Sequence, residues 1–362
     1  MKTPSHATDH EVAMADLNIK SITPMPSPGE LRQEIPLKPE VFARVVGPSR
    51  TVIQNIFNGS DKRLLAVVGP CSVSKVDETL EYAGRLTKLA HKVKDRIVIV
   101  MRTCLDKPRT GIGWAGFSQD PDLNGSLNIQ DGWRKGRRLL TNIVSMGLPV
   151  AMELLDADGC QNVDALVSYW WIGARTVTSL RLRQIASGLS TSVGFKNPTD
   201  GKIDDAIEAM DTAGHETAFI APNSAGRRCE YRTTGNKHGN LILRGSSNGP
   251  NYKSEFVESA VQKLTVRGLP TRVLIDASHG NSNKDYRKQR EIIQNIAERV
   301  ASGESHIAGF LYESYLEEGS QKLPKDLSDL KPRISITDGC DSWDTTQKVL
   351  LAAHKTLKNR IK

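Results

Sequence analysis

Short continuous apolar runs alternate with longer amphipathic stretches along most of the chain. The runs predict strands at residues 64–69, 97–101, 150–154, 170–175, 193–196, 241–244, 272–277 and 307–312. The stretches between them predict helices over 76–93, 131–146, 160–168, 178–188, 202–213, 253–267, 284–302 and 342–360. Apolar strands separated by helices are typical of parallel strands that are buried on both faces. Repeated in this way, the units predict a (β/α)8 TIM barrel, and an open doubly wound sheet is the alternative.

The first 28 residues differ from the rest because they are polar, rich in Ser, Pro and His, and show no sustained period. We expect 1–28 to be a mobile N-terminal arm, in which residues 17–23 could form a short strand on a partner edge. Residues 29–362 are expected to form a single barrel domain. A helix over 38–58 is predicted in two pieces, divided at Gly47-Pro48. Near 217–235 a β-rich insertion is expected, as a hairpin that follows the fifth helix.

Composition narrows the class of protein. The net charge is +8, for which nucleic acid is one possible reason. Only 5% of residues are aromatic and the basic residues are scattered, so anionic small substrates would explain the charge equally well, and we expect no nucleic-acid partner. No run approaches the roughly 18 uncharged apolar residues of a membrane span, and the N-terminus lacks the pattern of a targeting segment. The five cysteines are odd in number and form no CxxC pair. Free thiols in a reducing compartment, the cytoplasm, are therefore expected.

The loop after the second predicted strand is rich in groups that bind phosphate. An apolar run ends in Arg102, and Lys107, Arg109 and Thr110 then surround Pro108 before two glycines. Arginine offers planar, bidentate recognition of phosphate, and lysine offers a point charge. A solvated basic loop is the other interpretation of this stretch alone.

Other predicted strands also end in polar residues, and in a barrel all these ends meet at one mouth. Arg102, Arg175, Lys196 and Arg244 would place four cations there. Buried charges are costly unless paired, so together they would suit a phosphate, or a phosphate beside a carboxylate, although each singly could form a structural ion pair.

A second constellation at the same mouth combines a thiol, an imidazole and two carboxylates, from Cys71, His279, Glu313 and Asp338. Such donors could enclose a divalent metal, and their mixed soft and hard character leaves its identity open. Singly, Cys71 could be a buried small hydrophobe and His279 a satisfied loop histidine.

Seven short motifs carry a resemblance to a known family. They are Gly69-Pro-Cys-Ser72, Lys107-Pro-Arg-Thr110, Gly173-Ala-Arg-Thr176, Gly194-Phe-Lys-Asn197, Leu243-Arg-Gly245, Asp276-Ala-Ser-His279 and Ser335-Ile-Thr-Asp338. In order and nearly without gaps over roughly residues 15–360, they resemble the type I 3-deoxy-D-arabino-heptulosonate 7-phosphate (DAHP) synthases. The resemblance is to the feedback-regulated bacterial and fungal branch with an N-terminal extension.

The resemblance implies a transferase that condenses phosphoenolpyruvate with erythrose 4-phosphate and releases phosphate, as the first step of the shikimate pathway to aromatic amino acids. It implies one divalent metal ion (Mn, Fe, Co or Zn) on Cys71, His279, Glu313 and Asp338. The implied phosphoenolpyruvate contacts are Arg102, Glu153, Arg175, Lys196 and Arg244. The implied erythrose 4-phosphate contacts are Lys107, Arg109 and Thr110. Catalytic roles are expected for Lys107, Glu153, Lys196 and His279, with Glu153 and Lys196 as candidates for moving protons through water.

Three stretches depart from the family pattern, at Val73–Lys75, Val177–Arg183 and Pro222–Glu230, and Cys160 stands where relatives commonly carry Pro. The last two stretches and Cys160 lie in regions resembling the family's aromatic amino acid effector site and subunit contacts. We therefore expect catalysis to be retained and feedback control to be changed, lost or directed to another ligand, and neutral drift of these residues is the alternative. A homodimer or homotetramer is expected, with residues 15–35 pairing subunits. The alternatives are a synthase for another aldose phosphate and a non-catalytic regulatory paralogue.

Overall fold

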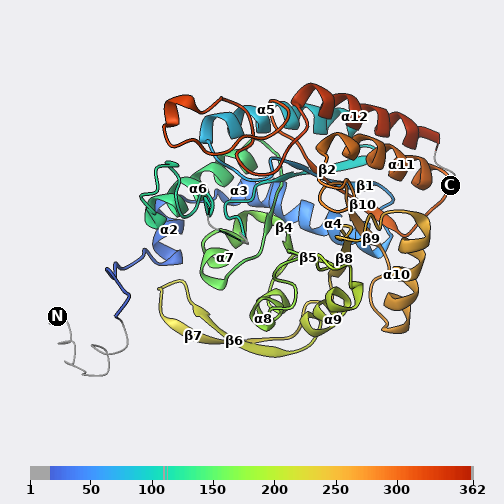
Figure 1. Ribbon diagram of the computed structural model, residues 1–362. Helices are drawn as coiled ribbons and strands as arrows, with labels where there is room; N and C mark the ends of the chain where they lie inside the picture. The colour runs from blue at the N-terminus through green and yellow to red at the C-terminus, as the bar shows by residue number, and fades with distance from the viewer. Residues whose placement is uncertain (1–16, 109–110, 112, 360–362) are drawn as a thin grey trace.

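Eight parallel strands close into a barrel in the computed structural model, which describes residues 17–359 except 109, 110 and 112 (Figure 1). The strands follow one another around the barrel in the order β1-β10-β9-β8-β5-β4-β3-β2. The sheet closes because β1 pairs with both β2 and β10, so that Val68 lies opposite Met101 on one side and Tyr312 on the other. The predicted barrel is confirmed, and the open sheet is excluded.

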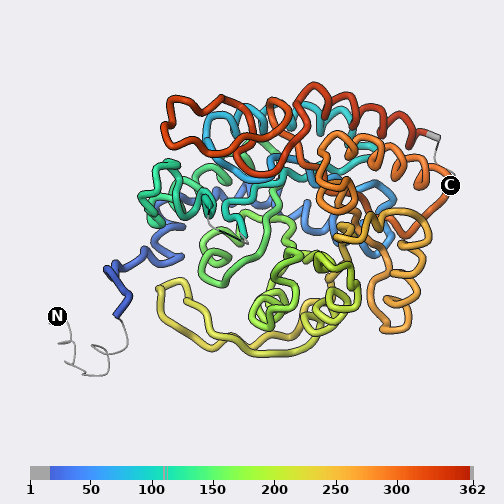
Figure 2. The backbone as a smooth tube through the Cα atoms, in the orientation of Figure 1, coloured from blue at the N-terminus to red at the C-terminus, as the bar shows by residue number. Residues whose placement is uncertain are grey.

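The barrel strands are β1 Leu64–Gly69, β2 Ile97–Arg102, β3 Val150–Glu153, β4 Val167–Ile172, β5 Ser192–Lys196, β8 Gly239–Leu243, β9 Val273–Asp276 and β10 Ile307–Glu313. The surrounding helices are α5 Val76–Val93, α6 Ile129–Ser145, α7 Ala157–Val163, α8 Leu180–Ser187, α9 Ile203–Ala213, α10 Ser254–Val266, α11 Gln289–Ala301 and α12 Trp343–Thr356. In the tube view these helices form a ring outside the strands (Figure 2). Each turns its apolar stripe inward, as α5 does with Tyr82, Leu86 and Leu89.

Several predicted boundaries are wrong: the helix expected over 160–168 runs over Ala157–Val163, and two others lie beside the mouth of the barrel. Strand β4 begins at Val167 and ends at Ile172, so Gly173 to Arg175 leave the sheet as a loop at the mouth. The helix expected from residue 284 begins only at Gln289, after a short 3-10 turn over Tyr286–Lys288. Asn283 and Lys284 have left-handed backbones, with φ of 52° and 62°, and such residues cannot continue a right-handed helix.

The N-terminal segment closes the bottom of the barrel. Helix α2 (Pro28–Glu34) is followed by one continuous helical rod, α3 Pro39–Val41, a π-helical turn Phe42–Val46 and α4 Gly47–Asn58. The predicted division at Gly47-Pro48 is wrong: the wider turn, in which the Gly47 N–H donates to the Phe42 carbonyl, accommodates Pro48 without a break. Ile53, Ile56 and Phe57 of α4 then pack into the barrel interior.

Residues 17–27 contain no helix or strand, and the stretch before Pro24 extends away from the barrel (Figure 1). The Pro24 carbonyl accepts a hydrogen bond from Gln130 Nε2 of α6 at 2.8 Å. The short strand considered for 17–23 is therefore not formed within this chain. The rest of the predicted arm, residues 1–16, lies outside the described residues, and the division at residue 28 stays a prediction.

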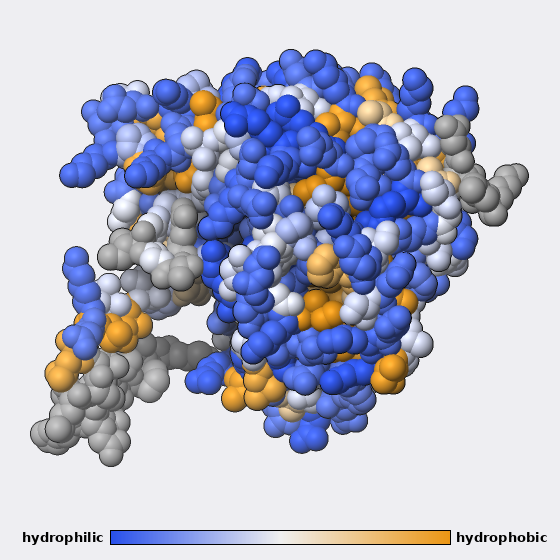
Figure 3. All heavy atoms as spheres, turned by 45° about the vertical axis from the view of Figure 1, so that its right-hand side comes forward, coloured by the Kyte–Doolittle hydropathy of each residue, from blue (hydrophilic) through white to orange (hydrophobic). Residues whose placement is uncertain are grey.

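The predicted hairpin is present after α9, the fifth barrel helix. Strands β6 (Thr217–Pro222) and β7 (Arg228–Thr233) pair antiparallel, with Phe219 opposite Tyr231. They lie across the outside of α7 and α8 (Figure 1). Among the described residues no helix is long and apolar enough to cross a membrane. On the face drawn in Figure 3, hydrophilic side chains dominate and the apolar spots are small and separate.

Candidate active site

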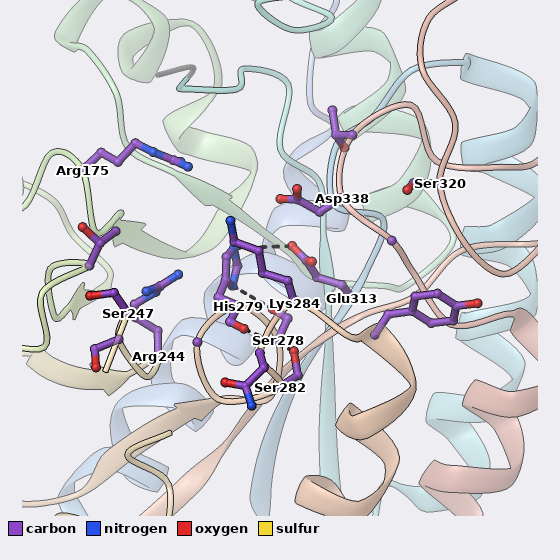
Figure 4. A pocket seen from close by; sticks show the side chains of 17 residues that line it. Arg175, Arg244, Ser247, Ser278, His279, Ser282, Lys284, Glu313, Ser320 and Asp338 are labelled. Atoms are coloured by element: carbon purple, nitrogen blue, oxygen red, sulfur yellow. Dashed lines mark hydrogen bonds and ion pairs between the residues drawn. The ribbon is translucent and has the colours of Figure 1, made fainter. Parts of the chain in front are cut away.

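The loops that follow the strands surround a cavity of about 580 Å³ at the mouth of the barrel. A smaller cavity of about 40 Å³ shares five of its lining residues, Arg175, Thr199, Arg244, His279 and Asp338. In Figure 4 the side chains of His279, Glu313 and Asp338 converge on one side of the larger cavity, and those of Arg175 and Arg244 reach toward them from the other. Basic groups, carboxylates and an imidazole therefore face one space.

A thiol and two carboxylates form a compact donor cluster at this mouth. One ligand atom each from Cys71, Glu313 and Asp338 lies within 4.8 Å of the others. The Nε2 atom of His279 lies 4.0 Å from Glu313 Oε1, at the edge of the cluster. The ammonium of Lys107 lies 2.6 Å from Cys71 Sγ and 3.7 Å from Asp338 Oδ2. The four predicted metal-binding residues thus share one corner of the mouth, with His279 at its border.

The orientation of His279 is fixed from behind. Its Nδ1 atom lies 2.9 Å from Asp276 Oδ2 and 2.8 Å from Ser278 Oγ. Its backbone is left-handed, with φ of 55°, a strained conformation that places the ring at the turn after β9. A carboxylate on Nδ1 leaves Nε2 free to act as a ligand, which is the usual arrangement behind metal-bound histidines. The residues therefore fit a divalent metal.

Arg102 is held rigidly at the end of β2 with one nitrogen unused. Its Nε donates to the Pro70 carbonyl at 3.1 Å, and its Nη2 donates to the Cys71 carbonyl at 3.2 Å and lies 3.1 Å from Glu313 Oε1. The residue is 2% exposed, yet Nη1 has no hydrogen-bond partner within the described residues. A buried guanidinium with a free N–H pair is prepared to receive an anion.

Lys196 and Asp276 form a buried ion pair across the mouth, 2.6 Å apart. Although burial alone would raise the pKa of Asp276, Lys196 and His279 hold it well below the usual range. Asp276 is thus a carboxylate shared by the lysine of β5 and the histidine after β9.

Arg244 and Arg175 form no ion pair within the described part of the chain. Arg244 is 7% exposed, and its Nη1 reaches only its neighbour's carbonyl, that of Gly245, at 3.4 Å. Arg175 is exposed and donates to the Pro108 carbonyl at 3.4 Å. Burial lowers the pKa of Arg244, and Arg175 lowers it further, against the opposing effect of Asp276. An anion between the two arginines would relieve this repulsion.

Burial and neighbouring carboxylates also set the protonation of the donor cluster. Burial, reinforced by Glu313, raises the pKa of the Cys71 thiol to about 12, although Lys107 opposes the change. Burial alone would lower the pKa of Lys107, but Cys71 and Glu313 raise it. For Asp338, burial acts to raise the pKa, but Lys107 and His279 together lower it. Lys107 therefore stays charged beside the sulfur.

Glu153 completes the set at the end of β3, where it is half-buried and lines the smaller cavity with Arg102 and Lys196. Arg109 and Thr110, the predicted erythrose 4-phosphate contacts beside Lys107, lie outside the described residues. The remaining residues of the predicted set line the two cavities, or, for Cys71, contact a lining residue.

Two important neighbours were absent from the predicted set. Asp276 could have been found, because it stands three residues before His279 and ends a strand. Trp171, whose ring lies under both Arg102 and Lys196, gave no such signal, since an apolar residue inside a strand is ordinarily core.

Comparison with known proteins identifies the family. The sequence profile of the DAHP synthetase I family matches residues 35–351. The chain is 39% identical over 349 residues to the Tyr-sensitive phospho-2-dehydro-3-deoxyheptonate aldolase of Salmonella typhimurium, covering 96% of this chain and 98% of that protein. It is 40% identical over 349 residues to the Trp-sensitive enzyme of Enterobacter agglomerans, covering 96% and 99%.

A solved structure leads to the same family. The phospho-2-dehydro-3-deoxyheptonate aldolase from Francisella tularensis SCHU S4 superimposes with a TM-score of 0.92 and 39% identity, covering 95% of this chain and all of that one. Sequence and fold agree over almost the full length, so this chain belongs to the DAHP synthetase I family.

Proposed function

We propose that the mouth of the barrel is the catalytic centre at which this DAHP synthase condenses phosphoenolpyruvate with erythrose 4-phosphate, releasing phosphate. One observation carries the assignment: three arginines face one space there, and each has guanidinium capacity that no acid of the described chain takes up. Arg102 has a buried nitrogen without a partner, and Arg175 and Arg244 form no ion pair. Leaving the buried guanidinium nitrogens of Arg102 and Arg244 unmatched is costly, and the exposed Arg175 faces the same space, so the arrangement supports a doubly anionic substrate.

Phosphoenolpyruvate carries a carboxylate and a phosphate, and both suit this surface. We assign it to Arg102, Arg175, Lys196 and Arg244, with Glu153 at the edge. Arginine forks bind either group through two parallel hydrogen bonds, whereas Lys196 adds a point charge. Because the ion pair with Asp276 fixes Lys196, little side-chain freedom is lost on binding.

We assign one divalent metal to Cys71, His279, Glu313 and Asp338, where it would act as a Lewis acid toward the aldehyde oxygen of erythrose 4-phosphate. A set of one sulfur, one nitrogen and two carboxylate groups suits Mn, Fe, Co or Zn better than Mg or Ca. The Cys71 thiol must lose its proton to become a ligand, and the neighbouring Lys107 ammonium favours that loss.

Erythrose 4-phosphate is assigned to Lys107 together with Arg109 and Thr110. The hydrogen bond from Arg175 to the Pro108 carbonyl ties this loop to the phosphoenolpyruvate side, so the two substrates would bind side by side. Water must add at C2 of phosphoenolpyruvate as C3 attacks the aldehyde. Glu153 and Lys196, which line the smaller cavity together, are the candidates for moving protons there.

We also propose that aromatic feedback differs from that of the Tyr- and Trp-sensitive relatives. Inside the hairpin the rings of Phe219 and Tyr231 stack 5.3 Å apart, and the Arg181 guanidinium lies 5.3 Å above Phe219. The Tyr231 hydroxyl donates to the Pro222 carbonyl at 3.0 Å. Both rings and this hydroxyl therefore already have partners within the chain. Titration of activity with Phe, Tyr and Trp tests the proposal, and strong ordinary inhibition by any of them would overturn it.

The remaining proposals concern the cellular compartment and the oligomeric state. All five cysteines are free, which supports the cytoplasm as the compartment. We propose a homodimer or homotetramer, and sedimentation velocity of the full chain against a variant that lacks residues 1–27 tests whether the N-terminal segment pairs subunits.

The decisive experiment measures phosphate release from phosphoenolpyruvate by EDTA-treated protein, with and without Mn²⁺. Erythrose 4-phosphate is compared with a five-carbon aldose phosphate. Metal-restored turnover with the four-carbon sugar alone is expected. Turnover only with the longer sugar would assign the barrel to another aldose, and metal binding without turnover on either would indicate a regulatory paralogue.

A further inference from the structure

At the mouth of the barrel, Arg102 and Lys196 lie over an aromatic ring rather than over a carboxylate. Trp171 lies in β4, fully buried at the top of the barrel interior. The Arg102 guanidinium carbon lies 5.1 Å from its ring centroid, and the Lys196 ammonium lies 5.6 Å from it. Both distances are within the range of cation–π attraction, which is strongest for indole. One neutral side chain therefore contacts two of the cations assigned to phosphoenolpyruvate.

A ring has an advantage over an acid at this position. Arg102 and Lys196 already have one carboxylate each, Glu313 and Asp276, and both carboxylates also face His279. A further acid beneath the cations would neutralise the site and weaken its hold on an anion. The negative face of an indole attracts both cations and carries no net charge, so their attraction for a doubly anionic substrate is preserved.

The ring itself is fixed by a column of aromatic residues inside the barrel. Trp171 packs against Tyr169 at 6.4 Å, and Tyr169 stacks on Phe57 of α4 at 5.9 Å. The Tyr169 hydroxyl donates to Asn240 Oδ1 at 2.9 Å. Gly194 leaves room for this column, because a Cβ at that position would lie 2.2 Å from the Tyr169 hydroxyl. The floor of the mouth therefore rests on the helix that closes the bottom of the barrel.

The surroundings of the indole N–H indicate that Trp171 contributes its ring face and not a hydrogen bond. Trp171 Nε1 is buried and has no hydrogen-bond partner among the described residues. An unpaired buried donor is destabilising, and phenylalanine would avoid it. An indole in this place is explained by the stronger attraction of its larger ring for cations.

We propose that Trp171 is a positioning residue for phosphoenolpyruvate, holding Arg102 and Lys196 at the spacing that the substrate's anionic groups require. The proposal rests on the assignment of phosphoenolpyruvate to these cations. It predicts an effect on the binding of that substrate, and none on erythrose 4-phosphate or on the metal, whose assigned contacts do not touch the ring.

The test compares Trp171→Phe and Trp171→Leu by calorimetric titration of the metal-loaded protein with phosphoenolpyruvate in the absence of erythrose 4-phosphate, and by KM for each substrate. From the usual size of desolvated cation–π contacts, Trp171→Leu is expected to raise the phosphoenolpyruvate Kd and KM by at least about tenfold, and Trp171→Phe by roughly threefold or less. Metal content and the KM for erythrose 4-phosphate should stay within about twofold of the wild type, less than the loss of one desolvated cation–π contact would cause, because their assigned contacts do not touch the ring.

Trp170 offers a matched control, because it lies next to Trp171 in β4 and its ring contacts no cation among the described residues. Trp170→Leu should lower the thermal midpoint without changing the Kd for phosphoenolpyruvate. If Trp171→Leu does not fold, fluorinated tryptophan incorporated into the wild type weakens the ring's negative face at nearly constant shape. The Kd should then rise with the number of fluorines, and should not do so in Trp171→Phe.

A Kd unchanged in Trp171→Leu, or unaffected by fluorination, would overturn the proposal. So would a parallel loss of both substrates and of metal, which would indicate packing alone. Absence of DAHP formation by the wild type would instead contradict the proposed function. The role of Trp171 is judged separately, from the Kd for phosphoenolpyruvate.

Discussion

Lys196 and Asp276 lie 80 residues apart in the sequence, and their charged atoms lie 2.6 Å apart in the barrel mouth. Both side chains are buried, and the same Asp276 oxygen also receives His279 Nδ1 at 2.9 Å. One carboxylate thus connects the proposed phosphate-binding side of the site to the proposed metal-binding side. A change at Asp276 should therefore affect both.

Replacing Asp276 with asparagine should impair the enzyme in two measurable ways. Lys196 would lose its buried counter-charge, and breaking such a pair costs about 3–5 kcal/mol of stability. His279 would lose the group that orients it, which typically weakens metal binding roughly 10–100-fold. Metal titration and urea unfolding measure the two effects.

Asp204→Asn is the control for this change, because Asp204 pairs with Lys263 on the surface at 2.7 Å. Exposed pairs contribute about 0–1 kcal/mol, so this variant should resemble the wild type. Normal metal affinity in Asp276→Asn would contradict the orienting role.

Gly173→Ala should displace Glu153 without unfolding the barrel. An added Cβ would lie 2.0 Å from Glu153 Oε1, and the flexible end of that side chain can move away. If Glu153 handles protons at C2, its displacement should lower kcat by roughly 10²-fold, as misplacement by about 1 Å commonly does. Steady-state kinetics with a thermal melt measures this.

Gly84→Ala is the matched control, since nothing lies within 4 Å of a Cβ there and Gly84 is inside α5. Alanine should stabilise that helix by about 0.5–1 kcal/mol and leave kcat unchanged. Full activity in Gly173→Ala would remove Glu153 from the mechanism.

The sequence was sufficient for the barrel and for the polar strand ends, because both follow from local periodicity. Except at β4, each apolar run stops within about one residue of the point where its strand leaves the sheet, as at Arg102 and Lys196. Local pattern was not sufficient at Pro48, where the helix continues through a π-helical turn. The local pattern was also not sufficient at Lys284, whose left-handed backbone delays the start of the next helix.

The contacts that give the site its character could not be predicted, since they depend on how the strands close. Asp276 was visible beside His279, but its pairing with Lys196 requires β5, β8 and β9 to be neighbours. Trp171 has the sequence pattern of a core residue, and it is buried in the core. The positions of Arg102 and Lys196 over its ring follow from the register of the strands.

Asp106 should make the protein less stable as the pH rises. Burial is the main reason that its pKa is about 7 instead of 3.8; the hydrogen bond from Ser118 opposes this, and Asp156 and Glu153 add to it. The native state holds the extra proton, so the stabilising effect is greatest below the unfolded pKa and is lost as the pH rises through the folded one. Between pH 5 and 8 the wild type should lose roughly 2–3 kcal/mol more than Asp106→Asn.

Urea unfolding of both proteins at the two pH values checks this difference. Asp326→Asn is the control, because the pKa of Asp326 is lowered from 3.8 and the group does not titrate in this interval. Equal pH dependence in Asp106→Asn and the wild type would show that Asp106 is ionised in the native protein at pH 5.

Arg102→Lys should keep the positive charge at this position but weaken the binding of phosphoenolpyruvate. The Arg102 guanidinium binds the Pro70 and Cys71 carbonyls and Glu313, and one of its nitrogens, which we propose binds the substrate, has no partner within the described residues. An ammonium has three donors and no fork, so it cannot reproduce both the anchoring and the bidentate contact. The KM for phosphoenolpyruvate should rise by roughly 10²-fold, in line with the loss of a charge-assisted bidentate pair.

Arg85→Lys, at an exposed pair with Glu81, is the control and should change nothing. A normal KM in Arg102→Lys would mean that positive charge alone binds the substrate at this corner, and that the unpartnered nitrogen has no part in recognition.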